Sequence, residues 1–317
     1  MHQFPHTPCQ YARHFTFNFR TQGPFHLYAR KSSKVEGVKT RTPVLDLDNL
    51  PWADDQPKHF VFDVDGTLTD DHSVTHPPTL DALRAAHDAG YAITVATGRL
   101  LHAGARILER AGIDGWVIAN CGSVVWDGEN VVEEHPLPTS TVERFIELGR
   151  ELGMTPAVYY VDDIYMDPLT EIDLPEATLN ANEGRPIHIA DLDSVDHTHV
   201  TKVQYGADIP IIEKHLPRIL EEFPEVVRGH PYFLELTPAG ITKWEGIETA
   251  LSRRGLAAAD GLGAGDSGND ASWLPKMGIS VAVPPSPPEI MEIVDAVLPS
   301  VDYPVADLIN SILRRNR

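Results

Sequence analysis

Two aspartates follow the apolar run at residues 58–62, in the segment DVDGT. We predict that Asp63 is a nucleophile and that Asp65 is a general acid and base. Ligands bind beyond the carboxyl ends of strands in open parallel sheets, and Gly66 permits a tight turn there. A pair of aspartates with this spacing is more often a solvated turn, so the prediction depends on support from the rest of the chain.

A second polar group follows the apolar run at residues 91–96. The hydroxyl of Thr97 and the exposed N–H of Gly98, at the start of a predicted helix, suit a phosphate oxygen. An ordinary helix cap has the same composition and is the better explanation of this group alone. Arg99, and Asn120 after the run at 116–119, are candidate substrate contacts, with structural capping as the equal alternative.

The last two groups lie near the carboxyl end of the chain. Lys243 begins a predicted helix, where its charge can neutralise both a phosphate and a carboxylate. The segment GDSGND at 265–270 contains Asp266 and Asp270, whose oxygens are the ligands that Mg²⁺ prefers, and Asn269, whose amide can position a neighbour. Taken singly, Lys243 is better explained as a surface lysine, and the alternative for GDSGND is an Asx-rich turn.

Short apolar runs alternate with amphipathic segments on both sides of a middle region. This alternation predicts an α/β fold with a Rossmann-like, doubly wound parallel sheet, which places the polar groups at one edge. Between residues 139 and 228 the predicted strands are short and hairpin-like, so we expect an inserted α+β module. The predicted domains are therefore a core at 56–138 and 229–317 and a cap at 139–228.

Four groups along the chain resemble, in the same order, the four signature motifs of the haloacid dehalogenase (HAD) superfamily. These groups are FDVDGT, ATGR, Lys243 and GDSGND. The resemblance covers about residues 58 to 310. It implies a magnesium-dependent phosphatase in which Asp63 becomes an aspartyl-phosphate and Asp65 serves as acid and then base. It also implies a Mg²⁺ ion held by Asp63, the main-chain carbonyl of Asp65 and Asp266, with Asp270 in support or as a further ligand. The phosphoryl oxygens are then held by Thr97, Gly98, Lys243 and Asn269.

Spacing indicates the branch of the superfamily. The interval from Asp65 to Thr97 is too short for a cap, whereas the interval from Thr97 to Lys243 holds the α+β module, as in type II caps. The segments ANCGS and FLELTPAGITK resemble the Cof-type, type IIB branch, from which Cys121 and Ser123 depart. In the module, the candidates for selecting the leaving group are Tyr159, Tyr160, Arg185 and Lys202, and a role in the fold alone is the alternative for each.

Composition restricts the partners. The formal net charge of −20 argues against nucleic acid and against an anionic membrane surface. Two cysteines are too few for a disulfide framework, and no apolar stretch approaches a membrane span. We therefore expect a cytoplasmic enzyme that acts on small phosphorylated metabolites such as sugar phosphates. The alternatives are a phosphomutase or phosphotransferase on the same fold, and a non-catalytic binding or regulatory protein.

The first 55 residues differ from the rest. Residues 1–42 contain seven basic side chains and one acidic side chain, with no apolar period. A targeting leader, a disordered tail and translated sequence upstream of the true start all have this composition. We predict that residues 1–55 form a basic, disordered extension outside the fold.

Overall fold

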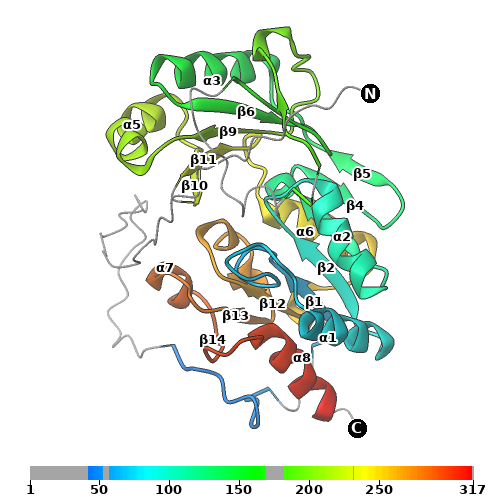
Figure 1. Ribbon diagram of the computed structural model, residues 1–317. Helices are drawn as coiled ribbons and strands as arrows, with labels where there is room; N and C mark the ends of the chain where they lie inside the picture. The colour runs from blue at the N-terminus through cyan, green and yellow to red at the C-terminus, as the bar shows by residue number, and fades with distance from the viewer. Residues whose placement is uncertain (1–41, 53–56, 169–181, 184, 231, 316–317) are drawn as a thin grey trace, which may run out of the picture. The chain divides into compact units, whose positions relative to one another are not determined.

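The strands of the computed structural model form two sheets (Figure 1). The structure describes residues 42–52, 57–168, 182–183, 185–230 and 232–315. None of the helices in these ranges is long and apolar enough to cross a membrane.

The first sheet contains the predicted parallel core. In spatial order its strands are β14 (Ala296–Val297), β13 (Ile279–Ala282), β12 (Gly261–Gly265), β1 (His59–Phe62), β2 (Ala92–Ala96), β3 (Trp116–Ala119), β4 (Val124–Trp126) and β5 (Val131–Glu134). The strands from β14 to β3 are parallel, whereas β4 and β5 are antiparallel to their neighbours. The order places β1 in the middle, between β12 and β2.

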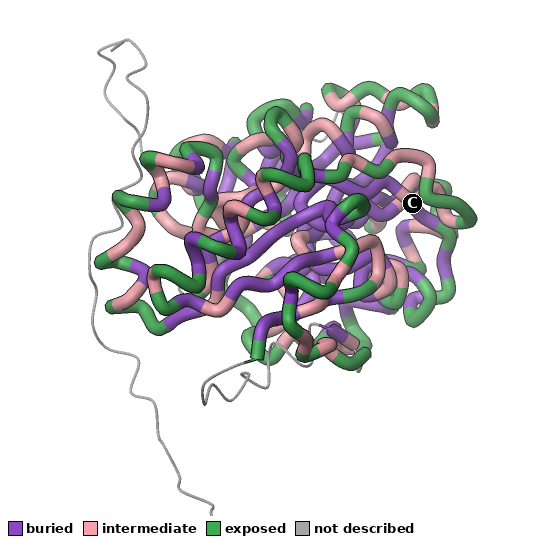
Figure 2. The backbone as a smooth tube through the Cα atoms, turned by 90° about the horizontal axis from the view of Figure 1, so that it is seen from above, coloured by how far each residue is buried: buried purple, intermediate pink, exposed green. Residues whose placement is uncertain are grey.

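Helices cover both faces of this sheet, which explains why its strands are continuously apolar. Phe60 and Phe62 of β1 belong to a core cluster with side chains of three helices: α1 (Pro77–Asp88), α2 (Leu101–Ala111) and α8 (Pro304–Arg315). Val61 between them belongs to a cluster on the opposite face with α6 (Lys243–Arg253) and α7 (Pro288–Met291). Figure 2 shows buried strands beneath helices that are exposed on their outer turns. The predicted doubly wound architecture is confirmed.

The second sheet is the predicted α+β module. Its spatial order is β10 (Val227–His230), β11 (Phe233–Leu236), β9 (Lys202–Gly206), β6 (Thr155–Tyr159), β7 (Ile164–Met166) and β8 (His188–Ile189). Val158 and Val203 point to one face, where they pack in a core cluster with α3 (Thr139–Glu151) and α5 (Ile209–Glu222). The alternation of apolar and polar residues along β6 and β9 therefore separates two faces.

The other face of the second sheet is buried and carries polar side chains beside a small apolar cluster that includes Ala157 and Met166. Tyr159 lies opposite Lys202 across β6 and β9, and Gln204 lies opposite Glu235 across β9 and β11. Lys202 is only 2% exposed, and Tyr159 and Gln204 are also buried. Burial of such side chains requires hydrogen-bond partners, and several of these come from loops of the first sheet, as described below.

The structure departs from the sequence predictions at three places. Strands β4 and β5 were not predicted, because they are short and joined by a turn at Asp127, whose carboxylate accepts from two following N–H groups. The second sheet continues through β11, which pairs with β9, whereas we had ended the cap at residue 228.

The third departure concerns residues 42–52, which we had assigned to a disordered extension. This assignment was wrong, because the segment packs on the first sheet. Val44 bridges to Val297 of β14, and Leu45 and Leu50 are buried in the core cluster of α1 and α8. The remaining residues of that predicted extension lie outside the described residues.

Candidate active site

The carboxyl end of β1 turns sharply and separates the two aspartates. Asp63 extends the pairing of β1 with β12, since its N–H donates to the Ala264 carbonyl (3.0 Å), and its side chain is buried. The next carbonyl, that of Val64, accepts the N–H groups of residues 67, 68 and 69. Gly66 has a left-handed φ of +76°, and a Cβ there would lie 2.6 Å from Asp266 Oδ2. The turn thus brings the chain against the loop that follows β12.

Lys243 lies at the first position of α6, which is held by a capping box of Thr242 and Glu245. Its ammonium group is fully buried and donates to Asp63 Oδ1 and to Asp270 Oδ1, the latter at 2.7 Å. Burial lowers the pKa of Lys243, but the two carboxylates raise it more, so the net shift is upward. The structure therefore places a permanent positive charge beside Asp63.

Asp270 is held by four donors. Its Oδ1 accepts from Lys243 and from the indole N–H of Trp273 (2.9 Å), and its Oδ2 accepts the backbone N–H groups of Asp266 and Ser267 (both 3.1 Å). Trp273, which the sequence analysis missed, is completely buried. Because its acceptor positions are in use, Asp270 orients Lys243 and shapes the loop after β12.

An acidic cluster of buried Asp63 and Asp270 and half-buried Asp266 lies at this lysine. One ligand atom from each of Asp63, Asp266 and Asp270 lies within 4.8 Å of the others. Burial, and then the neighbouring carboxylates, raise the pKa of Asp63 to about 7 and that of Asp266 to about 10. One ammonium group does not balance three carboxylates, so the cluster needs protons or a cation. Oxygen ligands with excess negative charge fit a hard divalent cation such as Mg²⁺.

Asp65 points away from this cluster and pairs with Arg99. The guanidinium Nε donates to both carboxylate oxygens (3.0 and 3.1 Å), while the Asp65 side chain stays about half exposed. Loss of water acts to raise the pKa of Asp65, but the charge and hydrogen bonds of Arg99 outweigh it, so the net shift is downward. Arg99 Nη1 is buried and has no hydrogen-bond partner among the described residues.

The turn at residues 97–99, after β2, is fixed by its own backbone and by the loop after β3. The Thr97 hydroxyl accepts the Arg99 N–H (3.0 Å), and the Thr97 carbonyl accepts the N–H of Cys121 (3.0 Å). Within the described part of the chain, the Gly98 N–H donates no hydrogen bond. The Gly98 N–H, on a half-buried residue, is therefore a free donor beside the completely buried Thr97 hydroxyl.

Asn120 and Asn269 differ in their accessibility. Asn120 is completely buried with a left-handed φ of +47°, and its Nδ2 donates to the Tyr160 carbonyl (2.7 Å) and to Thr201 Oγ1 (2.8 Å). It therefore joins the loop after β3 to the second sheet. Asn269 is half-buried next to Asp270, and its Oδ1 accepts from the Ser267 hydroxyl (3.1 Å).

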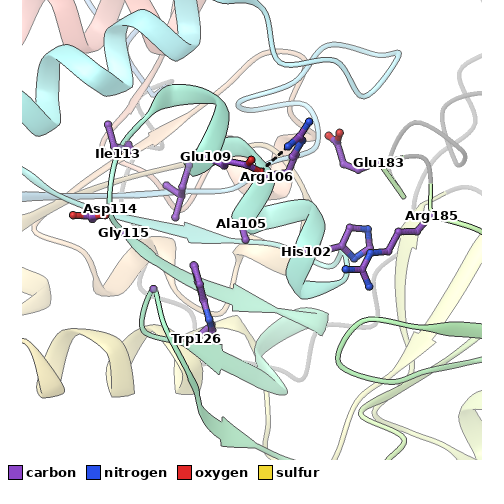
Figure 3. A pocket seen from close by; sticks show the side chains of 12 residues that line it. His102, Ala105, Arg106, Glu109, Ile113, Asp114, Gly115, Trp126, Glu183 and Arg185 are labelled. Carbon is purple, nitrogen blue, oxygen red and sulfur yellow. Dashed lines mark hydrogen bonds and ion pairs between the residues drawn. The ribbon is translucent and has the colours of Figure 1, made fainter.

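A separate pocket of about 520 Å³ lies beside α2 and the hairpin of β4 and β5 (Figure 3). His102, Arg106, Trp126 and Arg185 are among its lining residues, and Arg106 is paired with Glu109. None of the predicted catalytic, phosphate-binding or metal-binding residues lines it. Arg185, which we had considered as a leaving-group contact, belongs to this pocket.

The chain is similar to bacterial proteins that are named as phosphatases or putative phosphatases. The chain is 27% identical over 247 residues to the putative phosphatase YkrA of Bacillus subtilis (strain 168), covering 77% of this chain and 93% of that one. It is 26% identical over 240 residues to the HMP-PP phosphatase of Yersinia pseudotuberculosis serotype O:1b, covering 73% of this chain and 85% of that one.

Among solved structures, the HAD subclass IIB sugar phosphatase BT4131 superposes with a TM-score of 0.68 at 23% identity, covering 80% of this chain and 98% of that one. The fold is thus that of a HAD core with a type IIB cap. The family model of the haloacid dehalogenase-like hydrolases matches residues 60–309. The chain is an enzyme that belongs to the haloacid dehalogenase-like hydrolase family.

Proposed function

We propose that this hydrolase is a magnesium-dependent phosphatase that uses Asp63 as its nucleophile. The observation that carries the proposal is the position of Asp63. It lies at the carboxyl end of the central strand, with one oxygen held by buried Lys243 and with Asp65 on the same turn. The relatives named above as phosphatases support the same class of reaction.

In the first step, an oxygen of Asp63 attacks phosphorus and the bond from phosphorus to the leaving oxygen breaks. Asp65 donates its proton to that oxygen, so an alcohol leaves and an aspartyl-phosphate remains. Asp65 rests as a carboxylate paired with Arg99, so we expect the arriving substrate to weaken this pair and allow protonation.

In the second step, Asp65 accepts a proton from water, and the water oxygen attacks phosphorus. The bond to Asp63 breaks and inorganic phosphate is released. The downward pKa shift of Asp65 favours the carboxylate form that this step requires.

Phosphoryl transfer depends on positioning and on neutralising the equatorial oxygens. We assign this role to the Thr97 hydroxyl, the Gly98 N–H, Lys243 and Asn269. Asp63, Asp266 and the main-chain carbonyl of Asp65 would hold Mg²⁺, with Asp270 in support through Lys243. When bound, the ion supplies positive charge that lets an anionic phosphate approach an anionic carboxylate.

We assign the second sheet, with α3 and α5, to a cap that covers the leaving group. The substrates that we propose are small phosphorylated metabolites such as sugar phosphates. The buried polar side chains on one face of this sheet, Lys202 and Gln204 among them, support the assignment, because polar leaving groups need hydrogen-bond partners once water is excluded. Arg99 has a buried, unpartnered donor next to Asp65 and is the residue we expect to contact the leaving group.

The test is phosphate release from a panel of phosphorylated metabolites, with Mg²⁺ or with a chelator, by wild type and Asp63→Asn. We expect release that requires Mg²⁺ and is lost in the variant. Full activity of Asp63→Asn would overturn the mechanism. Transfer of the phosphoryl group to an added alcohol, without free phosphate, would instead identify a phosphotransferase.

A further inference from the structure

One buried lysine of the second sheet reaches the phosphate-binding turn. Lys202 Nζ donates to the Gly98 carbonyl (2.8 Å) and to Glu235 Oε1 (2.9 Å), and it lies 4.1 Å from the centroid of the Tyr159 ring. The side chains of Lys202 and Glu235 are 2% and 14% exposed. Lys202 and Glu235 belong to β9 and β11 of the second sheet, whereas Gly98 follows β2 of the first sheet, 104 positions before Lys202 in the chain.

The Gly98 carbonyl differs from the carbonyls on either side of it. Those of Thr97 and Arg99 accept backbone N–H groups from the loop after β3, at Cys121 and Asn120, so the first sheet holds them by itself. The Gly98 carbonyl is held by Lys202. The other end of the same peptide group, the Arg99 N–H, donates to the Thr97 hydroxyl. Lys202 is therefore linked through one planar peptide to Thr97.

Packing alone does not explain an ammonium group at this position. Burial of a charge costs several kcal/mol unless partners compensate, and a methionine of similar length would fill the space without that cost. Glu235 supplies the opposite charge, and its other oxygen accepts from the Cys121 thiol (3.6 Å). The charge-assisted hydrogen bond to the Gly98 carbonyl is the contact that an apolar side chain cannot replace.

We propose that Lys202 is a positioning residue for the phosphatase reaction: it orients the Gly98–Arg99 peptide so that the Thr97 hydroxyl and the Gly98 N–H face the phosphoryl oxygens. This inference rests on the proposed function. It gives the cap a direct part in forming the phosphate-binding site. Glu235 acts through Lys202, by neutralising it.

The experiment compares Lys202→Met, Glu235→Gln and the double variant Lys202→Met/Glu235→Gln with wild type. Steady-state kinetics, inorganic phosphate affinity by calorimetry with Mg²⁺, and unfolding in urea are measured for each. Loss of a charge-assisted hydrogen bond predicts that Lys202→Met binds phosphate about tenfold to a hundredfold more weakly, with a similar loss in kcat/KM. Glu235→Gln keeps the bond from Lys202 to Gly98 but leaves the Lys202 charge unpaired, so we expect it to lose stability and to weaken phosphate binding less than Lys202→Met does. Lys214→Met, an exposed change on α5, is the matched control.

The double variant separates positioning from stability. It contains no unpaired buried charge, so we expect it to recover most of the stability that Lys202→Met loses while phosphate affinity stays low. Recovery of both properties would overturn the proposal and leave Lys202 a purely structural residue, as would unchanged phosphate affinity in Lys202→Met. Failure of the proposed function is distinguishable, because then wild type itself releases no phosphate.

Discussion

Removal of the Lys243 ammonium group should make the stability of the fold strongly dependent on pH. In Lys243→Met, Asp63 and Asp270 lose the single cation that lies between them, and Asp266 is close by. All three carboxylates stay in a buried cluster. Breaking a buried ion pair by removing one partner costs about 3–5 kcal/mol when the remaining charge cannot be neutralised.

Protonation is the route by which these carboxylates can be neutralised, and it sets the sign of the pH effect. The pKa of Asp63 is raised to about 7 in the folded protein, against about 3.9 for an unperturbed aspartate. The folded state therefore binds protons more tightly than the unfolded state, and stability falls as pH rises from about 4 to 7. Lys243 lowers the pKa of Asp63, so its removal extends this fall to higher pH.

The assay is urea unfolding of wild type and Lys243→Met at pH 5.5 and pH 8.5, with a chelator present. We expect a loss of about 3–5 kcal/mol at pH 8.5 and about half of that or less at pH 5.5. Lys58→Met is the control, because Lys58 forms an exposed pair with Asp260 that contributes about 1 kcal/mol or less. An equal loss at both pH values, or a loss at pH 8.5 no larger than that of the control, would refute the reasoning.

Three further predictions address the acidic cluster and the amino-terminal segment. Binding of Mg²⁺ should tighten between pH 6 and pH 8 and release protons, because a metal competes with the proton on Asp63; a proton count of zero by calorimetry in two buffers would contradict this. Gly66→Ala should be destabilised more than Gly240→Ala, because both have positive φ but only the first new Cβ meets Asp266; equal urea midpoints would exclude that contact. Leu50→Ala should cost about 2–5 kcal/mol of unfolding free energy in urea, and a cost near zero would show that residues 42–52 do not belong to the core.

The elements of the parallel core were predictable because their signals are local. Strands β1 and β2 are buried on both faces, which leaves continuous apolar runs ended by polar turns. The amino-terminal segment was missed because its burial depends on partners about 250 residues away. Leu45 donates its N–H to Val297, and the Ser311 hydroxyl donates to the Leu47 carbonyl.

The motifs also predicted which residues meet. Asp63 and Lys243 are 180 positions apart; Asp63 follows the central strand of the first sheet, and Lys243 reaches it from the first position of α6. The carboxyl ends of parallel strands gather at one edge whatever the intervening chain contains. The number and order of the motifs therefore indicated at which edge of the sheet the site lies.

By itself, the sequence determined the class of fold, the family and the edge of the sheet where chemistry is possible, because apolar periodicity and turn residues act over a few positions. Only the tertiary structure decided that Asp65 pairs with Arg99, that Asn120 faces the second sheet and that Lys202 reaches Gly98. These contacts depend on how two sheets and their loops pack. The position of a polar residue in the sequence does not specify which of several polar neighbours becomes its hydrogen-bond partner once the two side chains are buried.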